Sequence, residues 1–211
     1  MFTKKEGVSI LIAMIIMAFT LTFLEGVPIL KTFPKYFIFA FVIISISVLS
    51  KQAVGRVLQI EIKQSIWKWQ RFWFTKWAYF KKPIPLGLIL APLFAFLFMF
   101  RYFLCFLQYD SKALLMKATK RWGAKRYSEM MEWDDALIVF YSTLPLLITG
   151  IIISFFSANV LQEFSKIIVI YAMSNLIPIS RLDGTKLFFG SRTLFWFTWI
   201  LALLSLLPVI F

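Results

Sequence analysis

Six long apolar blocks constrain this chain more than any other feature. They occupy 8–24, 36–58, 86–107, 136–156, 166–180 and 193–211. A helix needs about 20 predominantly apolar residues to cross a bilayer, so most of these blocks are long enough to be spans. The chain is 61% hydrophobic with a mean hydropathy of +0.82, whereas soluble domains are roughly 45–50% apolar. The blocks therefore predict a single integral membrane domain over 1–211.

The distribution of basic residues selects among the topologies that six blocks allow. Lys and Arg gather in the cytoplasmic loops of membrane proteins. If all six blocks crossed, each side would hold eleven of the 23 basic residues, which gives no orientation. If 86–107 enters and leaves on one side, that side holds 20 and the other holds only Lys31, Lys35 and Lys166. This bias predicts five spans and one re-entrant hairpin in the cell membrane, with the N-terminus cytoplasmic and the C-terminus external.

The predicted fold class is an all-α polytopic membrane protein whose re-entrant part is allowed to be partly β. Backbone that is not helical at membrane depth is tolerated only when protein or water satisfies its polar groups, so the hairpin should pack against the helices. The spans 36–58 and 166–180 both end on the cytoplasmic side. Lys51, Gln52 and Gly55 are therefore expected at the same depth as Asp183.

The net charge of +13 raises the question of nucleic-acid binding. The segment Lys63–Lys82, "KQSIWKWQRFWFTKWAYFKK", interleaves aromatic rings with Lys and Arg, and a platform for single strands would use the same residue types. Neighbouring spans favour the headgroup layer instead, where aromatic rings and long cationic side chains are both stable. Membrane lipid is thus the predicted partner, and nucleic acid is not.

One polar motif closes the apolar segment that precedes the last span. It reads "NLIPISRLDG", with Asn175, Pro178, Leu182, Asp183 and Gly184 in fixed spacing. This pattern resembles the Asn-x-x-Pro-x-x-x-Leu-Asp-Gly signature of site-2 proteases, which are zinc metalloproteases that cut within the bilayer. The continuation "TKLFFGSR" is similar to small archaeal members. The resemblance implies a site-2-protease-like helical core, with the Asp as third zinc ligand and a membrane hairpin before it.

The same resemblance implies a His-Glu-x-x-His helix, and here that helix is degenerate. In "VLSKQAVGRVL", Lys51 stands at the first His, Gln52 at the Glu and Gly55 at the second His. An ammonium group repels a dication, an amide is no base, and glycine has no ligand atom. The chain contains no histidine at all, so Asp183 cannot complete a zinc site of three protein ligands. Zinc is therefore predicted to be absent, and no catalytic residue is assigned. The family's Gly-Pro-x-x-Asn element is also altered, to Leu144, Pro145 and Ile148.

Asp183 needs a partner, because a charge at membrane depth costs roughly 2.5–3.5 kcal/mol. We predict an ion pair in which Lys51 or Arg56 occupies the former metal position. Two alternatives stay open: Asp183 caps a helix that begins near it, and Lys51 extends to the headgroups. The resemblance implies a substrate groove formed by Asn175, Pro178, Leu182 and Gly184.

Two further sets of residues have ordinary structural interpretations. Cys105 lies in an apolar run and is expected to pack in the core. Four acids precede a span and are expected to shape the start of a helix rather than to form a catalytic pair, namely Glu129, Glu132, Asp134 and Asp135.

The predicted function is a catalytically inactive site-2-protease-like protein that binds or regulates transmembrane helices of client proteins. One alternative is an active intramembrane metalloprotease with unrecognised ligands or ligands supplied by a partner chain. Another is a small transporter or structural membrane protein, which the breaks at Pro92, Pro145 and Pro178 allow. Measuring the metal content of the purified protein tests the metalloprotease alternative. Measuring flux across vesicle membranes tests the transporter alternative.

Overall fold

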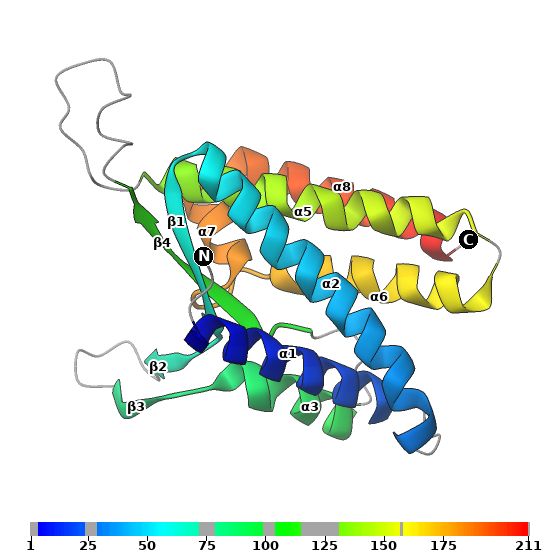
Figure 1. Ribbon diagram of the computed structural model, residues 1–211. Coiled ribbons are helices and arrows are strands. Elements are labelled where there is room, and N and C mark those ends of the chain that lie inside the picture. Colours follow the sequence, from blue (N-terminus) through cyan, green and yellow to red (C-terminus); the bar gives the residue numbers. More distant parts are fainter. Residues whose placement is uncertain are drawn as a thin grey trace, which may run out of the picture.

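The computed structural model describes residues 4–23, 29–71, 79–98, 104–114, 131–156 and 158–210. About 75% of these residues are helical. In chain order the elements are α1 (Lys4–Phe23), α2 (Ile29–Val57), β1 (Ile60–Ile66), β2 (Trp69–Arg71), β3 (Tyr79–Ile84), α3 (Leu86–Phe98), β4 (Leu107–Ala113), α5 (Glu132–Ser154), α6 (Asn159–Asn175), α7 (Asp183–Gly190) and α8 (Arg192–Ile210). Figure 1 shows α5, α6 and α8 side by side, with α2 crossing them and α1 and α3 on its other side.

Four helices of the described residues are long and apolar enough to cross a membrane, namely α1, α2, α5 and α8. They coincide with four of the five predicted spans. The fifth prediction, 166–180, differs from the structure, where α6 has 17 residues and ends at Asn175. Pro178 accounts for the early end, because the residue before a proline is disfavoured in helical conformation. The seven residues 176–182 form a non-helical loop between α6 and α7.

The segment 86–107 leaves the strands and comes back to them. The described part of its helix α3 has 13 residues, about 20 Å at 1.5 Å per residue. Trp67 joins the two ends, since its N–H donates to the Phe106 carbonyl at 2.9 Å and its carbonyl accepts from Gly87 at 3.0 Å. A Cβ on Gly87 would lie 2.4 Å from the Phe106 oxygen. Entry and exit therefore lie side by side, as a re-entrant path requires. Residues 99–103, with Arg101, are outside the described residues.

The β structure lies beside the hairpin rather than within it. β1 pairs antiparallel with β4 from Ile60↔Ala113 to Ile66↔Leu107, and β2 pairs with β3 through Trp69↔Ile84. Alternate residues of β1 are buried, because its inner face packs on the end of α2. Both pairs of strands lie at one end of the helices (Figure 1).

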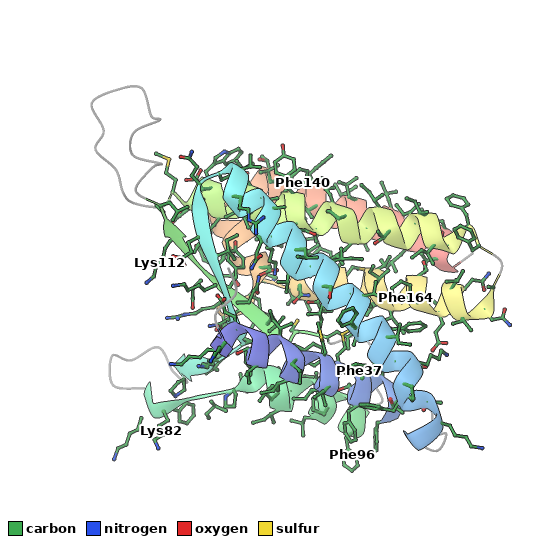
Figure 2. All side chains as sticks on the ribbon, in the orientation of Figure 1. Phe37, Lys82, Phe96, Lys112, Phe140 and Phe164 are labelled. Atoms are coloured by element: carbon green, nitrogen blue, oxygen red, sulfur yellow. The ribbon has the colours of Figure 1, made fainter. Side chains whose placement is uncertain are left out.

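That end of the molecule also gathers charge. It holds the start of α1, the end of α2, the strands and the start of α5 and α7 (Figure 1). Figure 2 shows Lys82 and Lys112 projecting there, whereas Phe37, Phe96, Phe140 and Phe164 lie along the helices. The N- and C-termini lie toward opposite ends of the helical layer (Figure 1). The segregation of charge from the apolar helices matches a chain that spans a bilayer.

Candidate functional site

A buried ion pair joins the end of α2 to the start of α7. Lys51 Nζ lies 2.5 Å from Asp183 Oδ2, and the two side chains are 5% and 8% exposed. Of the two cations considered for this role, Lys51 is therefore the one that pairs, whereas Arg56 is exposed. Removing a charge from water is costly unless an opposite charge meets it, so each partner makes the burial of the other tolerable.

Asp183 does not cap the helix that it begins. α7 starts at Asp183, with Leu182 at the N-cap position and no side-chain capping bond. Within the described residues, the second carboxylate oxygen, Oδ1, has no hydrogen-bond partner. The helix dipole still favours an acid at this position. The capping interpretation is thus wrong, because the Asp183 carboxylate makes no capping hydrogen bond. Its partner is Lys51.

Tyr109 of β4 lies between the ion pair and a second lysine. Its ring centroid is 5.3 Å from Lys51 Nζ and 3.3 Å from Lys186 Nζ. Lys186 also donates to the Tyr109 carbonyl at 2.6 Å. The Tyr109 hydroxyl donates to Asp135 of α5 at 3.4 Å, and Ser111 donates to the same carboxylate oxygen at 2.8 Å. One strand thereby ties α2, α5 and α7 together.

Burial shifts the pKa of two groups in this cluster. The pKa of Lys186 lies below its ordinary value because desolvation disfavours the ammonium, against the attraction of Asp135 and Asp183. The pKa of Tyr109 lies well above its ordinary value, first because it is buried and then because Asp135 opposes a phenolate. Both shifts follow the rule that burial disfavours the charged form.

Sequence reasoning missed Tyr109, Lys186 and the bonding role of Asp135. Lys186 stands three residues after Asp183, a spacing that places both on one face of a helix, so this signal was present. Tyr109 gave no comparable signal, because only strand pairing brings it to the site. Asp135 does lie in the first turn of α5, as predicted, but it also accepts hydrogen bonds from β4.

The other degenerate positions of α2 contact other parts of the protein. Gln52 and Arg56 line a separate pocket of about 280 Å³ that also contains Glu6, Glu61 and Lys63. Gly55 faces β1, where a Cβ would lie 2.7 Å from Ile62 Cδ1 and 2.9 Å from the Ile60 carbonyl. The space that a second histidine would need is thus filled by a strand.

These residues do not fit a zinc ion. A zinc site with three protein ligands requires neutral imidazole, thiolate or carboxylate groups at about 2.0–2.3 Å. Among the described residues no three His, Cys, Asp or Glu side chains come together as a metal site would require. Asp183 pairs with the ammonium of Lys51, and Gly55, one turn further along α2, packs on Ile62. A cation thus already lies beside the Asp183 carboxylate, and a larger side chain at position 55 has no space.

The motif residues build the loop between α6 and α7. Asn175 is buried and donates to the Tyr171 carbonyl of its own helix at 3.0 Å. Leu182 is fully buried, in a cluster with Trp67 and Cys105. A Cβ on Gly184 would lie 2.0 Å from the Leu176 carbonyl, so only glycine lets the loop fold back on α7. Of the four predicted groove residues, Pro178 alone is exposed.

Cys105 packs as expected, fully buried, with its Sγ 2.9 Å from the Ser174 carbonyl. It thereby fastens the returning arm of the hairpin to the end of α6, directly before Asn175 of the motif.

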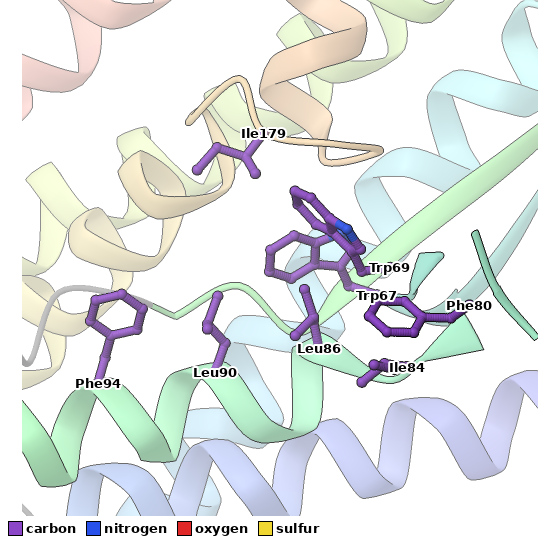
Figure 3. Close-up of a pocket in the computed structure, with 8 residues that line it drawn as sticks. All are labelled: Trp67, Trp69, Phe80, Ile84, Leu86, Leu90, Phe94 and Ile179. Atoms are coloured by element: carbon purple, nitrogen blue, oxygen red, sulfur yellow. The ribbon is translucent and has the colours of Figure 1, made fainter. Parts of the chain in front are cut away.

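An apolar pocket of about 430 Å³ lies next to the loop (Figure 3). Its lining comes from the link between β1 and β2, the strands β2 and β3, the helix α3 and the loop. It consists of Trp67, Trp69, Phe80, Ile84, Leu86, Leu90, Phe94 and Ile179. Figure 3 shows the two tryptophans next to each other, with Ile179 facing them from the loop. Sequence reasoning had not predicted this pocket.

No family model, no curated protein and no solved structure matches this chain. The likeness to site-2 proteases therefore rests on the motif residues alone.

Proposed function

We propose that this chain is a catalytically inactive site-2-protease-like membrane protein that holds transmembrane segments of client proteins without cutting them. The observation that carries the proposal is the ion pair of Lys51 with Asp183. It places a fixed cation at the position that the resemblance assigns to the metal. With the ammonium of Lys51 at that position, no Lewis acid is held there to activate a water molecule.

The loop 176–182 supports a binding role for the remaining scaffold. Irregular backbone at membrane depth is tolerated when it is buried in protein or lines a cavity, and Ile179 of this loop lines a pocket. Pro178, Ser180 and Arg181 are exposed, so a client segment could reach the loop along this edge. The rest of the motif is buried and keeps the loop in place.

Photocrosslinking in proteoliposomes tests the proposal. A benzophenone amino acid replaces Pro178, and the matched control carries it at Phe155, which is 78% exposed at the far end of α5. The probes are two synthetic transmembrane peptides, one uninterrupted and one with a central Gly-Pro break. We expect the broken peptide to crosslink to position 178, with little crosslinking at 155 and no cleavage by mass spectrometry.

Two results would contradict the proposal. Equal crosslinking at both positions would mean that the loop is no binding site. Cleavage that a chelator abolishes, together with one zinc per chain by elemental analysis, would show that the protein is a metalloprotease with other ligands.

A further inference from the structure

The volume of the apolar pocket indicates which kind of molecule it can hold. Ligand pockets usually enclose about 300–1,000 Å³, and this one encloses about 430 Å³. A helix with side chains is about 10 Å wide and rises 5.4 Å per turn, so this volume would hold about one turn. The pocket is thus too small for a transmembrane helix, and its apolar lining suits a single flexible hydrocarbon chain.

Exposed lysines alternate with the residues that line the pocket. Lys68 lies between Trp67 and Trp69, while Lys81 and Lys82 lie between Phe80 and Ile84. All three are exposed, and none of them forms an ion pair within the described residues. Lys82 projects away from the helices in Figure 2.

The surrounding sequence offers these lysines no acid. From Gln64 to Tyr109 the chain has six basic residues and no Asp or Glu. The segments that line the pocket thus also carry exposed positive charge with no acid among them. The pocket's partly exposed rings, Trp69 and Phe80, are of the type that lies at the level of lipid headgroups.

From this geometry we infer that the pocket binds one anionic phospholipid, with an acyl chain among Trp67, Leu90 and Phe94 and the headgroup at Lys68, Lys81 and Lys82. Both halves of the lipid meet matching chemistry: the chain meets apolar side chains and the phosphate meets ammonium groups. A zwitterionic lipid has the same chains, but the cation of its headgroup opposes the lysines. The site is independent of whether the protein binds clients.

Native mass spectrometry of the purified protein in detergent tests this site. The protein is titrated with phosphatidylglycerol or with phosphatidylcholine that carries the same acyl chains. We expect one phosphatidylglycerol to be retained with roughly a hundredfold preference, since each of the three lysines contributes on the order of 1 kcal/mol near an anionic headgroup.

Two variants divide the site into its halves. Lys68→Gln/Lys81→Gln/Lys82→Gln should remove the preference for phosphatidylglycerol, whereas Lys31→Gln/Lys112→Gln/Lys166→Gln removes the same charge elsewhere and should keep it. Leu90→Trp fills the pocket and should abolish retention of either lipid. Leu93→Trp is its control, because Leu93 is 44% exposed on the same helix.

Three results would overturn the inference. Equal retention of the two lipids would remove the role of the headgroup. Equal loss in both triple variants would mean that binding is a general effect of charge. Retention of an apolar transmembrane peptide that is sensitive to Leu90→Trp, without retention of either lipid, would make the pocket a peptide site.

Discussion

Helix α2 carries two lysines that each pair with an acid on another helix, and the two pairs differ in burial. Lys51 pairs with Asp183 of α7, and their side chains are 5% and 8% exposed. Lys35, near the other end of α2, pairs with Glu163 of α6, and these side chains are 32% and 33% exposed. Glu163 also accepts a hydrogen bond from Tyr36.

The difference shows that the same chemistry has two structural roles. In a partly exposed ion pair, contacts with water are replaced by a contact with the partner, so the net gain in stability is small. Salt also screens such a pair. In a buried pair, loss of one partner leaves the other charge without water or a counter-charge. The Lys35–Glu163 pair is a contact between helices, whereas the Lys51–Asp183 pair determines whether α7 can keep its first residue inside the protein.

Breaking the buried pair should have the largest effect. Asp183→Asn leaves the Lys51 ammonium buried without a counter-charge, and we expect a loss of about 3–5 kcal/mol in the free energy of unfolding. Lys51→Met/Asp183→Asn removes both charges and should recover most of it. Unfolding by a denaturing detergent measures both. If the single and double variants were equally unstable, the pair itself would not be what matters.

Overpacking next to β1 should come next in size. Gly55→His places a histidine against Ile62 and the Ile60 carbonyl, and overpacking of this kind costs about 1–3 kcal/mol. Lys51→His/Gln52→Glu/Gly55→His recreates the ligand pattern of site-2 proteases; it adds the loss of the Lys51–Asp183 pair to that cost, and we expect no stoichiometric zinc by elemental analysis. Ala53→His, at an exposed position of the same helix, is the control for stability. Uptake of one zinc by the triple variant would show that β1 can move aside.

The exposed pair should contribute less. Lys35→Met is expected to lower stability by about 0–1 kcal/mol. That difference should shrink as ionic strength rises, while the effect of Asp183→Asn should not, because a buried pair is screened much less. Unfolding curves at low and high salt compare the two. A salt-independent loss at Lys35 would mean that its packing on Tyr36 matters more than its charge.

The smallest effect should come from pH and Lys186. Its pKa is below 10.5 in the folded protein, so between that pKa and 10.5 the unfolded chain binds more protons. Stability should therefore rise with pH from that pKa up to about pH 10. Above pH 10.0 Tyr109 ionises in the unfolded chain and not in the folded one, which lowers stability and opposes the rise. Lys186→Met should remove the rise. An unchanged rise in this variant would assign it to another group.

Much of the fold could be predicted from residue type alone. Four span-length helices and the returning path of 86–107 follow from apolar length and from the distribution of Lys and Arg. The end of α6 was predicted at 180 instead of 175, because an apolar run does not show where Pro178 stops the helix. The strands were harder, since β1 and β4 pair over a long separation that no local pattern reveals.

The candidate site divides in the same way. Asp183 and Lys51 could be named from the motif and from the cost of a buried charge. That Gln52 and Arg56 lie outside the site could not be predicted, because their direction depends on how α2 is rotated about its axis. The burial of Asn175, Leu182 and Gly184 depends on how the loop folds against α7.

The sequence by itself determined that this chain belongs in a bilayer and that it lacks imidazole ligands, since hydrophobicity and donor chemistry belong to the residues whatever their arrangement. Tertiary structure alone decided which cation reaches Asp183, which strand fills the space at Gly55 and where the apolar pocket lies. Those outcomes depend on the rotation of helices and the register of distant strands, which only the packing of the whole chain fixes.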